Sequence, residues 1–320
     1  MERGARLPFL LLTTEELMEA QSPLKNSTAI AFETAKEVPK NSSKSPIYFI
    51  SGLPRSGSTL LAAILRQNPR FQAGMTSPVG SLVSRMLEGM AEDQEYSVLI
   101  SPQQKRELIL SVFSAYYHQQ IDNGQVIFDT NRLWCSKLPL LNELFPQAKV
   151  ICCVRNIAWV MDSIERLVRR NAFDVSKLFD RGEAATVYSR TEALSQGNRL
   201  VGFAYNALRE AFYSEEAAKL LLVDYQLLTS DPVQTLGLIY RFIDEPCFSH
   251  NFEQVEYEEP EFDCQLNTKG LHKVRPKVEF QPRRTILPPD LFERFNALSF
   301  WHDTTGSLAN VIAINNQQIL

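Results

Sequence analysis

The sequence has few of the features that mark several large classes of protein. Its five cysteines include no pair at C-x-x-C spacing, which argues against the usual zinc and redox motifs. Long hydrophobic runs are scarce near the N-terminus, where the longest, residues 8–12, is far short of the roughly 20 residues of a spanning helix. That stretch is also too short for the apolar region of a signal peptide. We therefore expect a cytoplasmic protein that does not cross a membrane.

An excess of basic residues is also missing. Lysine and arginine total 33 against 37 acidic residues, for a net charge of -4, so no broad positive field is available to bind nucleic acid. An anionic ligand would need a local site. The 320 residues are 44% hydrophobic, enough to bury a large core. We expect a peripheral extension over residues 1–45, one domain over 46–302 and a C-terminal tail over 303–320.

Short apolar runs alternate with segments of helical periodicity from residue 46 onward. Runs rich in β-branched, aromatic and aliphatic residues occur at 47–50, 126–128, 150–154 and 220–223. The run at 150–154 is apolar at every position, as in a parallel strand that is covered on both faces. This alternation predicts right-handed βαβ units. The expected fold class is α/β, a three-layer P-loop-type fold with a mainly parallel central sheet flanked by helices.

Polar residues follow these predicted strands. Ligands of open parallel sheets bind beyond the carboxyl ends of the strands. Arg55, Asp129, Arg155 and Tyr225 all occupy such positions in the sequence. We therefore expect them to face one crevice.

The segment from Gly52 to Thr59, GLPRSGST, fits the glycine frame of a P-loop but has Ser58 at the lysine position. A loop of backbone amides at a helix N-terminus binds phosphate whatever nucleotide carries it. The missing lysine argues against an ordinary NTPase or kinase, and Arg55 can supply the cation instead. A glycine turn without a ligand is the simpler alternative.

A second anion site is suggested by Arg155 and Ser163. Eight residues span just over two helical turns, so a helix that begins near Ile157 would bring Ser163 toward Arg155. A guanidinium and a hydroxyl together suit a phosphate. The simpler alternative is that Arg155 forms a surface ion pair with Asp162 or Glu165.

These motifs together resemble the sulfotransferases that use 3′-phosphoadenosine 5′-phosphosulfate (PAPS). The resemblance rests on PRSGST and on Arg155-x7-Ser163, and it covers roughly residues 46–302. Further segments are similar to the tyrosylprotein sulfotransferase branch and its bacterial relatives, namely 67–71, 145–149, 224–226 and 231–232.

The resemblance implies a role for each matching residue. The 5′-phosphosulfate would be contacted by the loop residues Arg55, Ser56, Gly57, Ser58 and Thr59. Arg155 and Ser163 would hold the 3′-phosphate, and Tyr225 the nucleoside. In cytosolic members a late basic loop also reaches the 3′-phosphate, for which Lys269 and Lys273 are candidates; a solvated basic loop is the alternative.

The chain departs from the tyrosylprotein branch at one functional segment. That branch has a catalytic glutamate in Gly-Glu-Glu-Thr-Arg, whereas residues 74–78 here read Gly-Met-Thr-Ser-Pro. It also has a Golgi signal anchor, which we do not find in this sequence. The transfer reaction is therefore expected to carry over, but not the acceptor.

The reaction also needs a base that takes the proton of the acceptor hydroxyl. We nominate Asp129, whose pKa burial would raise and Arg132 would lower, with Glu88 in reserve. The alternative is that Asp129 caps or salt-bridges the turn at residues 131–132. Arg132 and Trp134, beside Asp129, are candidates for an acceptor wall, with a core tryptophan as the alternative. His272 is interpreted as a structural or surface residue.

The sequence thus predicts a PAPS-dependent sulfotransferase that needs no metal and releases 3′-phosphoadenosine 5′-phosphate (PAP). Its acceptor would be a hydroxyl of a small molecule or of a tyrosine-containing peptide. Two alternatives stay open: a P-loop kinase of a small molecule, which would need Mg²⁺ and ATP, and a nucleotide-binding module without catalysis. The sequence leaves the acceptor and the oligomeric state open.

Overall fold

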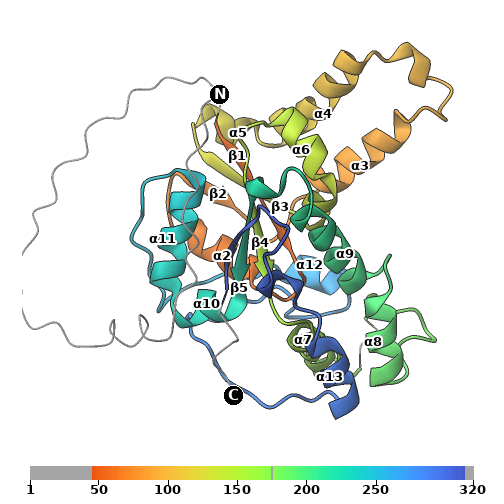
Figure 1. The fold of residues 1–320 in the computed structure, drawn as a ribbon, viewed down its shortest axis with the longest axis vertical. Helices are drawn as coiled ribbons and strands as arrows, with labels where there is room; N and C mark the ends of the chain where they lie inside the picture. Colours follow the sequence, from red (N-terminus) through yellow and green to blue (C-terminus); the bar gives the residue numbers. More distant parts are fainter. Residues whose placement is uncertain (1–44, 174–175, 314–320) are drawn as a thin grey trace, which may run out of the picture.

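The computed structural model describes residues 45–173 and 176–313, and its centre is a single parallel sheet (Figure 1). Neighbouring strands pair in the order β2-β3-β1-β4-β5-β6, and every pairing is parallel. The strands are β1 (Ile47–Gly52), β2 (Phe71–Ala73), β3 (Val126–Thr130), β4 (Val150–Val154), β5 (Leu220–Asp224) and β6 (Asn310–Ile312). The predicted mainly parallel sheet is confirmed.

Strand order places a switch point beside β1. After β1 the chain forms β2 and β3 on one side, then crosses to β4, β5 and β6 on the other. Crevices at such points lie outside the carboxyl ends of the strands. The segment that follows β1, residues 53–57, therefore occupies the position where this architecture binds ligands.

Helices cover both faces of the sheet, which gives the predicted three layers (Figure 1). Alternate strand residues enter two separate cores: Phe49, Cys152 and Leu222 face one, and Ile50, Ile151 and Val223 face the other. The second core is closed by α2 (Ser58–Leu65), α10 (Tyr225–Ser230) and α11 (Pro232–Ile243). The first is closed by α4 (Pro102–Tyr116), α6 (Leu138–Leu144), α7 (Ile157–Arg170), α9 (Leu200–Phe212) and α13 (Pro289–Asn296). The remaining helices are α3 (Val79–Gly89), α5 (His118–Asp122), α8 (Val187–Ser195) and α12 (Pro260–Gln265).

Capping residues fix the starts of two helices. Ser101 and Gln104 form a capping box at the start of α4, with Pro102 in the first turn. Asp231 accepts a hydrogen bond from the Gln234 amide at the start of α11. Tyr117 lies between α4 and α5, so this helical segment is interrupted there.

One strand of the sheet lies beyond residue 302, the expected end of the domain. Residues 310–312 form β6, which pairs with β5 and so belongs to the sheet. A run of three residues is too short to show strand periodicity, and the same is true of β2. The sheet therefore extends into the predicted tail.

No helix within residues 45–173 and 176–313 has the length and apolar character needed to span a bilayer. Residues 1–44 of the predicted extension lie outside the described part of the chain. The cytoplasmic location expected from the sequence stays a prediction.

The end of β1 requires a glycine at position 52, because the backbone there has a positive φ and because β4 lies too close for a side chain. Its φ is +100°, and a Cβ on it would lie 2.3 Å from the carbonyl oxygen of Cys153 in β4. That same carbonyl accepts a hydrogen bond from the Leu53 amide at 2.9 Å. The close approach of β1 and β4 at the start of the loop therefore depends on this glycine.

We predict that Gly52→Ala lowers the free energy of unfolding by at least about 2 kcal/mol. A left-handed backbone costs an L-residue roughly 1–2 kcal/mol, and the clash with β4 adds to it. The matched control is Gly89→Ala in α3, where a Cβ meets nothing within 4 Å and where alanine should stabilise the helix by up to about 1 kcal/mol. Urea denaturation of both variants is the measurement, and equal effects would contradict the explanation.

Candidate functional site

The loop between β1 and α2 has the backbone of an anion-binding turn. Gly57, with φ of 97°, is the N-cap of α2, and no side chain caps that helix end. Ser58 and Thr59 occupy the first turn and are partly exposed. Backbone amides at such a helix start attract a negative charge. The part of the loop predicted to hold a phosphate is thus arranged to do so.

The side chain of Ser56, which we expected to contact the 5′-phosphosulfate, points into the protein instead. Its side chain is fully buried and its hydroxyl donates to the carbonyl oxygen of Cys153 at 2.8 Å and to that of Leu53. The hydroxyl therefore fastens the loop to β4. Any contact between Ser56 and a ligand has to come from its backbone.

Arg55 extends from the loop to two distant segments. It adopts a left-handed backbone with φ of 58°. Its Nε donates to the Ser163 hydroxyl of α7 at 3.2 Å, and its Nη1 donates to the carbonyl of Leu271. Burial lowers the pKa of this guanidinium; Arg283 and Arg170 lower it further, while Tyr225 and Asp263 raise it. Arg55 is thus a desolvated cation at the start of α2.

Arg155 lies beside Arg55 at the end of β4. Its guanidinium carbon is 4.2 Å from the centre of the Tyr225 ring, and its Nη1 donates to the Arg55 carbonyl at 3.4 Å. Burial lowers the pKa of Arg155 to about 10, with Arg283 and Arg55 acting in the same direction. The structure therefore brings Arg55, Arg155, Ser163 and Tyr225 together, as the sequence predicts.

The alternative interpretation of Arg155 as a surface ion-pair partner is wrong. Asp162 pairs with Arg166 at 2.9 Å and with Arg283 at 2.6 Å. Glu165 pairs with Arg169 and Arg190, both at 2.7 Å. Within the described ranges, no salt bridge includes Arg155. Its stacking on Tyr225 leaves the guanidinium edge available to an anion.

Arg283 is a site residue that sequence reasoning missed. It lies over the Trp159 ring at 5.7 Å, and its positive charge acts on both Arg55 and Arg155. Its Nε is buried and forms no hydrogen bond in the described part of the chain. The only available sequence signal is the adjacent pair Arg283-Arg284. Lys269 and Lys273 are exposed instead, and Lys273 forms a surface ion pair with Glu258 at 3.3 Å.

Asp129 does not face the crevice in the way the sequence predicts. It is fully buried, and its carboxylate accepts hydrogen bonds from Ser77 Oγ at 2.6 Å, Tyr117 Oη at 2.7 Å and Trp134 Nε1 at 2.7 Å. Burial raises its pKa, while these three hydrogen bonds lower it. None of the hydrogen bonds or ion pairs of the described residues joins this carboxylate to Arg55 or Arg155. The cause is strand alternation, which turns Asp129 toward the core that contains Trp134.

The structure also differs from the roles predicted for the residues near Asp129 and for Glu88. The turn after β3 is capped by Asn131, whose Oδ1 accepts from the Leu133 amide at 3.1 Å, and not by Asp129. Arg132 is not among the causes that shift the pKa of Asp129. Trp134 is fully buried core and cannot form an acceptor wall. Glu88, the reserve base, is exposed in the last turn of α3.

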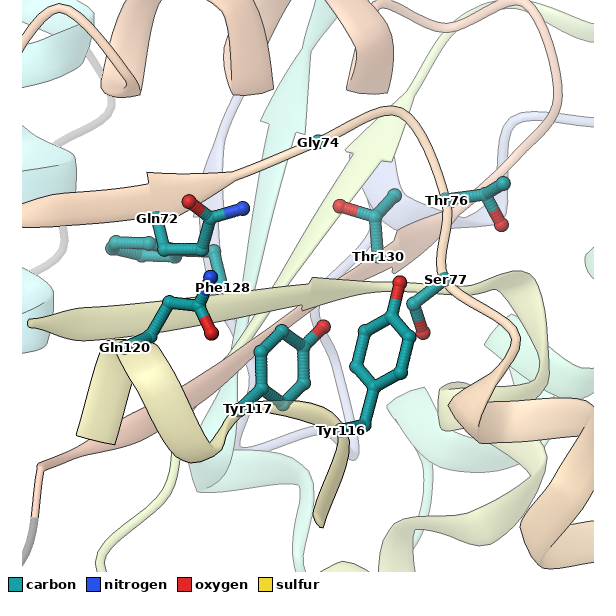
Figure 2. A pocket seen from close by; sticks show the side chains of 9 residues that line it. All are labelled: Gln72, Gly74, Thr76, Ser77, Tyr116, Tyr117, Gln120, Phe128 and Thr130. Carbon is teal, nitrogen blue, oxygen red and sulfur yellow. The ribbon is translucent and has the colours of Figure 1, made fainter. Parts of the chain in front are cut away.

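A cavity of about 300 Å³ opens beside this network, at the ends of β2 and β3 (Figure 2). Figure 2 shows the two tyrosine rings side by side, with two glutamine amides toward one end and the threonine and serine residues toward the other. The lining has no charged side chain and consists of Gln72, Gly74, Thr76, Ser77, Tyr116, Tyr117, Gln120, Phe128 and Thr130. The hydroxyl of Thr130 is buried and has no hydrogen-bond partner within the described ranges. The cavity therefore suits an uncharged group that forms hydrogen bonds.

The family follows from comparison with known proteins. Residues 46–250 match the model of the sulfotransferase family, and the chain belongs to that family. The resemblance expected from the sequence motifs is confirmed.

Curated relatives include protein-tyrosine sulfotransferases. The chain is 27% identical over 207 residues to protein-tyrosine sulfotransferase 1 of Danio rerio, covering 63% of this chain and 54% of that protein. It is 25% identical over 211 residues to the protein-tyrosine sulfotransferase of Drosophila melanogaster, covering 63% of this chain and 38% of that protein. The chain thus spans about half the length, or less, of these relatives.

Solved structures that are similar include two sulfotransferase domains. The domain of the Synechococcus PCC 7002 olefin synthase has 19% identity and a TM-score of 0.43, and it covers 82% of this chain and 98% of that chain. The domain from the curacin biosynthetic pathway has 16% identity and a TM-score of 0.44, and it covers 80% of this chain and 91% of that chain.

Asp224 should make the stability of the site depend on pH. It caps α10 by accepting from the Gln226 amide at 2.7 Å, directly before Tyr225, and burial raises its pKa to about 6. A carboxyl whose pKa is raised on folding stabilises fully below its ordinary value of 3.8 and loses that contribution as the pH rises to about 6. In the unmodified protein the free energy of unfolding should therefore fall by a few kcal/mol as the pH rises from 4 to 7, since one pKa unit is about 1.4 kcal/mol. We predict that Asp224→Asn, which keeps the cap, removes this fall.

Urea denaturation between pH 4 and 7 measures this effect. Asp231→Asn is the control, because it replaces another helix cap at a less buried position and should leave the pH dependence in place. An unchanged slope in Asp224→Asn would contradict the assignment.

Proposed function

We propose that this protein moves a sulfuryl group from PAPS to a hydroxyl acceptor and releases PAP. The observation that carries the proposal is that Arg55 of the loop at residues 52–57 contacts both Arg155 and Ser163. Its Nε donates to the Ser163 hydroxyl, and its backbone carbonyl accepts from Arg155. A nucleotide with phosphate groups at both the 5′ and the 3′ position matches two such elements. Membership of the sulfotransferase family supports the same reaction.

The residues present fit this nucleotide. Three guanidiniums, those of Arg55, Arg155 and Arg283, gather at the carboxyl ends of β1 and β4, and Asp162 contacts only the last of them. The unpartnered Nε of Arg283 is a further donor for a phosphate oxygen. Tyr225 packs against the loop, where a Cβ on Gly57 would lie 3.0 Å from its ring. This packing gives a ring surface beside the loop for the nucleoside.

Each group has a distinct task in the proposed reaction. When bound, PAPS supplies the sulfuryl group and a phosphate leaving group. The amides at the start of α2 and Arg55 stabilise the negative charge that develops on the leaving oxygen. Arg155, Ser163 and Arg283 hold the 3′-phosphate and so fix the orientation of the nucleotide. The uncharged cavity at the ends of β2 and β3 is the proposed place of the acceptor.

The proposed acceptor class is based on the names of the similar proteins. Their names describe transfer to protein tyrosine, and we propose tyrosine-containing peptides together with small phenols and alcohols as the acceptors to test. A small-molecule kinase is the alternative for a P-loop, but Ser58 replaces the lysine that bridges the phosphates in such enzymes.

The first test is transfer of radiolabelled sulfuryl groups from PAPS to a panel of tyrosine peptides, phenols and alcohols. We expect transfer to persist in EDTA, because Arg55 supplies the positive charge near the leaving oxygen. Arg55→Ala should lower turnover by roughly 2–4 kcal/mol in the barrier. Transfer of phosphate from ATP with a strict Mg²⁺ requirement would instead establish the kinase.

The second test concerns the 3′-phosphate. Arg155→Ala should weaken the binding of PAP by about 1.5–3 kcal/mol and the binding of adenosine 5′-phosphosulfate much less, because only PAP has the phosphate that Arg155 would hold. Calorimetry measures both. Arg294→Ala, which removes an exposed arginine paired with Glu192, is the control and should change neither. Equal weakening of both ligands by Arg155→Ala would overturn the assignment.

A further inference from the structure

His272 and Asp263 form a hydrogen-bonded pair next to the phosphate loop. His272 Nδ1 lies 2.6 Å from Asp263 Oδ1, and the backbone amide of His272 donates to Asp263 Oδ2 at 3.0 Å. Both carboxylate oxygens are thus bound to one residue. Asp263 is buried in α12, and the His272 ring packs edge-on against Phe262 at 5.4 Å. The imidazole is held in one orientation.

The pair belongs to a segment that crosses the carboxyl ends of the strands. This late segment, residues 255–278, begins with a hydrogen bond from the Val255 amide to the Pro276 carbonyl. Tyr257 Oη accepts from the Met75 amide at 3.0 Å, next to Gly74 and Thr76 of the cavity. The other end of the segment meets the loop, because the Leu271 carbonyl accepts from Arg55. The late segment therefore spans from the cavity to the phosphate loop.

One peptide group connects Arg55 to the histidine pair. The carbonyl of the Leu271–His272 peptide accepts from Arg55, and its amide donates to Asp263. A peptide group is planar, so these contacts fix His272 relative to the Arg55 guanidinium. The arrangement positions the imidazole beside the group that is proposed to stabilise the leaving oxygen.

Charges from three elements act on His272. Arg55 after β1, Arg132 after β3 and Asp263 of α12 are its charged neighbours. Burial lowers the pKa of His272, Arg55 and Arg132 lower it further, and Asp263 raises it. The ring is therefore neutral near pH 7, and the contact with Asp263 assigns the proton to Nδ1. Nε2 then has a lone pair, and none of the hydrogen bonds of the described residues uses it.

Asp129 and Glu88, the other candidates for the general base, are less suited to accept a proton from an acceptor. The Asp129 carboxylate is fully buried and already accepts three hydrogen bonds. Glu88 is exposed near the end of α3. His272 instead feels the charges of both Arg55 and Arg132, and Arg132 is two residues from Thr130 of the cavity. We infer that His272 is the general base of the proposed sulfuryl transfer and that Asp263 is its positioning residue.

This role rests on the proposed function. The lone pair of His272 Nε2 takes the proton of the acceptor hydroxyl while the acceptor oxygen forms its bond to sulfur. The bond between sulfur and the 5′-phosphate oxygen breaks, and that oxygen keeps the electron pair beside Arg55 and the loop amides. The imidazolium then loses its proton to solvent, which returns the base to its starting state.

The test compares His272→Ala, His272→Gln and Asp263→Asn with His118→Gln, which removes an exposed histidine of α5. We expect both His272 variants to lose at least about 100-fold in kcat, as removal of a general base does, while their affinity for PAP stays within about twofold. Added imidazole should restore part of the turnover of His272→Ala. His118→Gln should match the unmodified protein.

The pH dependence supplies an independent readout. In the unmodified protein kcat should rise with pH and level off above an apparent pKa below 6.5, and NMR titration of His272 should give the same value. Asp263→Asn should lower that pKa, because the carboxylate raises it, and should lower kcat while leaving PAP binding intact. This titration uses the unmodified protein and so remains decisive where a variant does not fold.

The outcomes separate this inference from the proposed function. If the unmodified protein binds PAP but transfers no sulfuryl group to any acceptor, the proposed function and the role of His272 both fail. If it transfers normally and His272→Gln keeps its turnover and its pH profile, His272 is not the base. If Asp129→Asn abolishes the rise of kcat with pH and the His272 variants keep it, the base is Asp129 instead.

Discussion

The desolvation of clustered guanidinium groups is the constraint on which the rest of this site depends. Arg55 and Arg155 lie at the ends of adjacent strands, and burial lowers the pKa of both. Two cations that are held together out of water are costly unless negative charge or a π surface offsets them. The Tyr225 ring and the distant carboxylate of Asp263 offset only part of that cost. An anion with several charges would offset more of the cost, as the doubly phosphorylated nucleotide of the proposed function would.

Asp162 organises the second side of the same region. It is fully buried, pairs with Arg166 and Arg283, and accepts from the amide of Ile286 at 2.8 Å. One carboxylate of α7 therefore fixes both a cation near the site and the backbone that leads to α13. Removal of this carboxylate would leave two partly buried cations without their ion-pair partner, so its function is to hold the region together and not to react.

The sequence predicts those parts of the fold and site that are encoded by neighbouring residues. Four strands, their parallel arrangement and the capped starts of α4 and α11 follow from local pattern. The grouping of Arg55 with Arg155 also follows, since strand ends converge in a parallel sheet. In each case the signal is a local pattern, either an apolar run with the polar residue that follows it or a capping residue at a helix start.

The parts that could not be predicted depend on contacts between distant segments. Asp129 is turned away by strand alternation and satisfied by Tyr117 and Trp134, which no local spacing reveals. Arg283 and His272 reach the site from residues 266–288, which form no helix or strand, so neither periodicity nor a motif places them there. No sequence motif marks His272 as a functional residue, and its pairing with Asp263 is seen only in the folded structure.

The position of β6 has a consequence for the boundaries of the folded unit. β5 forms parallel hydrogen bonds with Asn310–Ile312, so this short strand covers the backbone groups along one side of the apolar run at Leu220–Asp224. A chain cut at residue 302 would present that run with free amides and carbonyls. Such an uncovered apolar strand is a template for pairing with other chains, so Asn310–Ile312 protect the protein against self-association through its sheet.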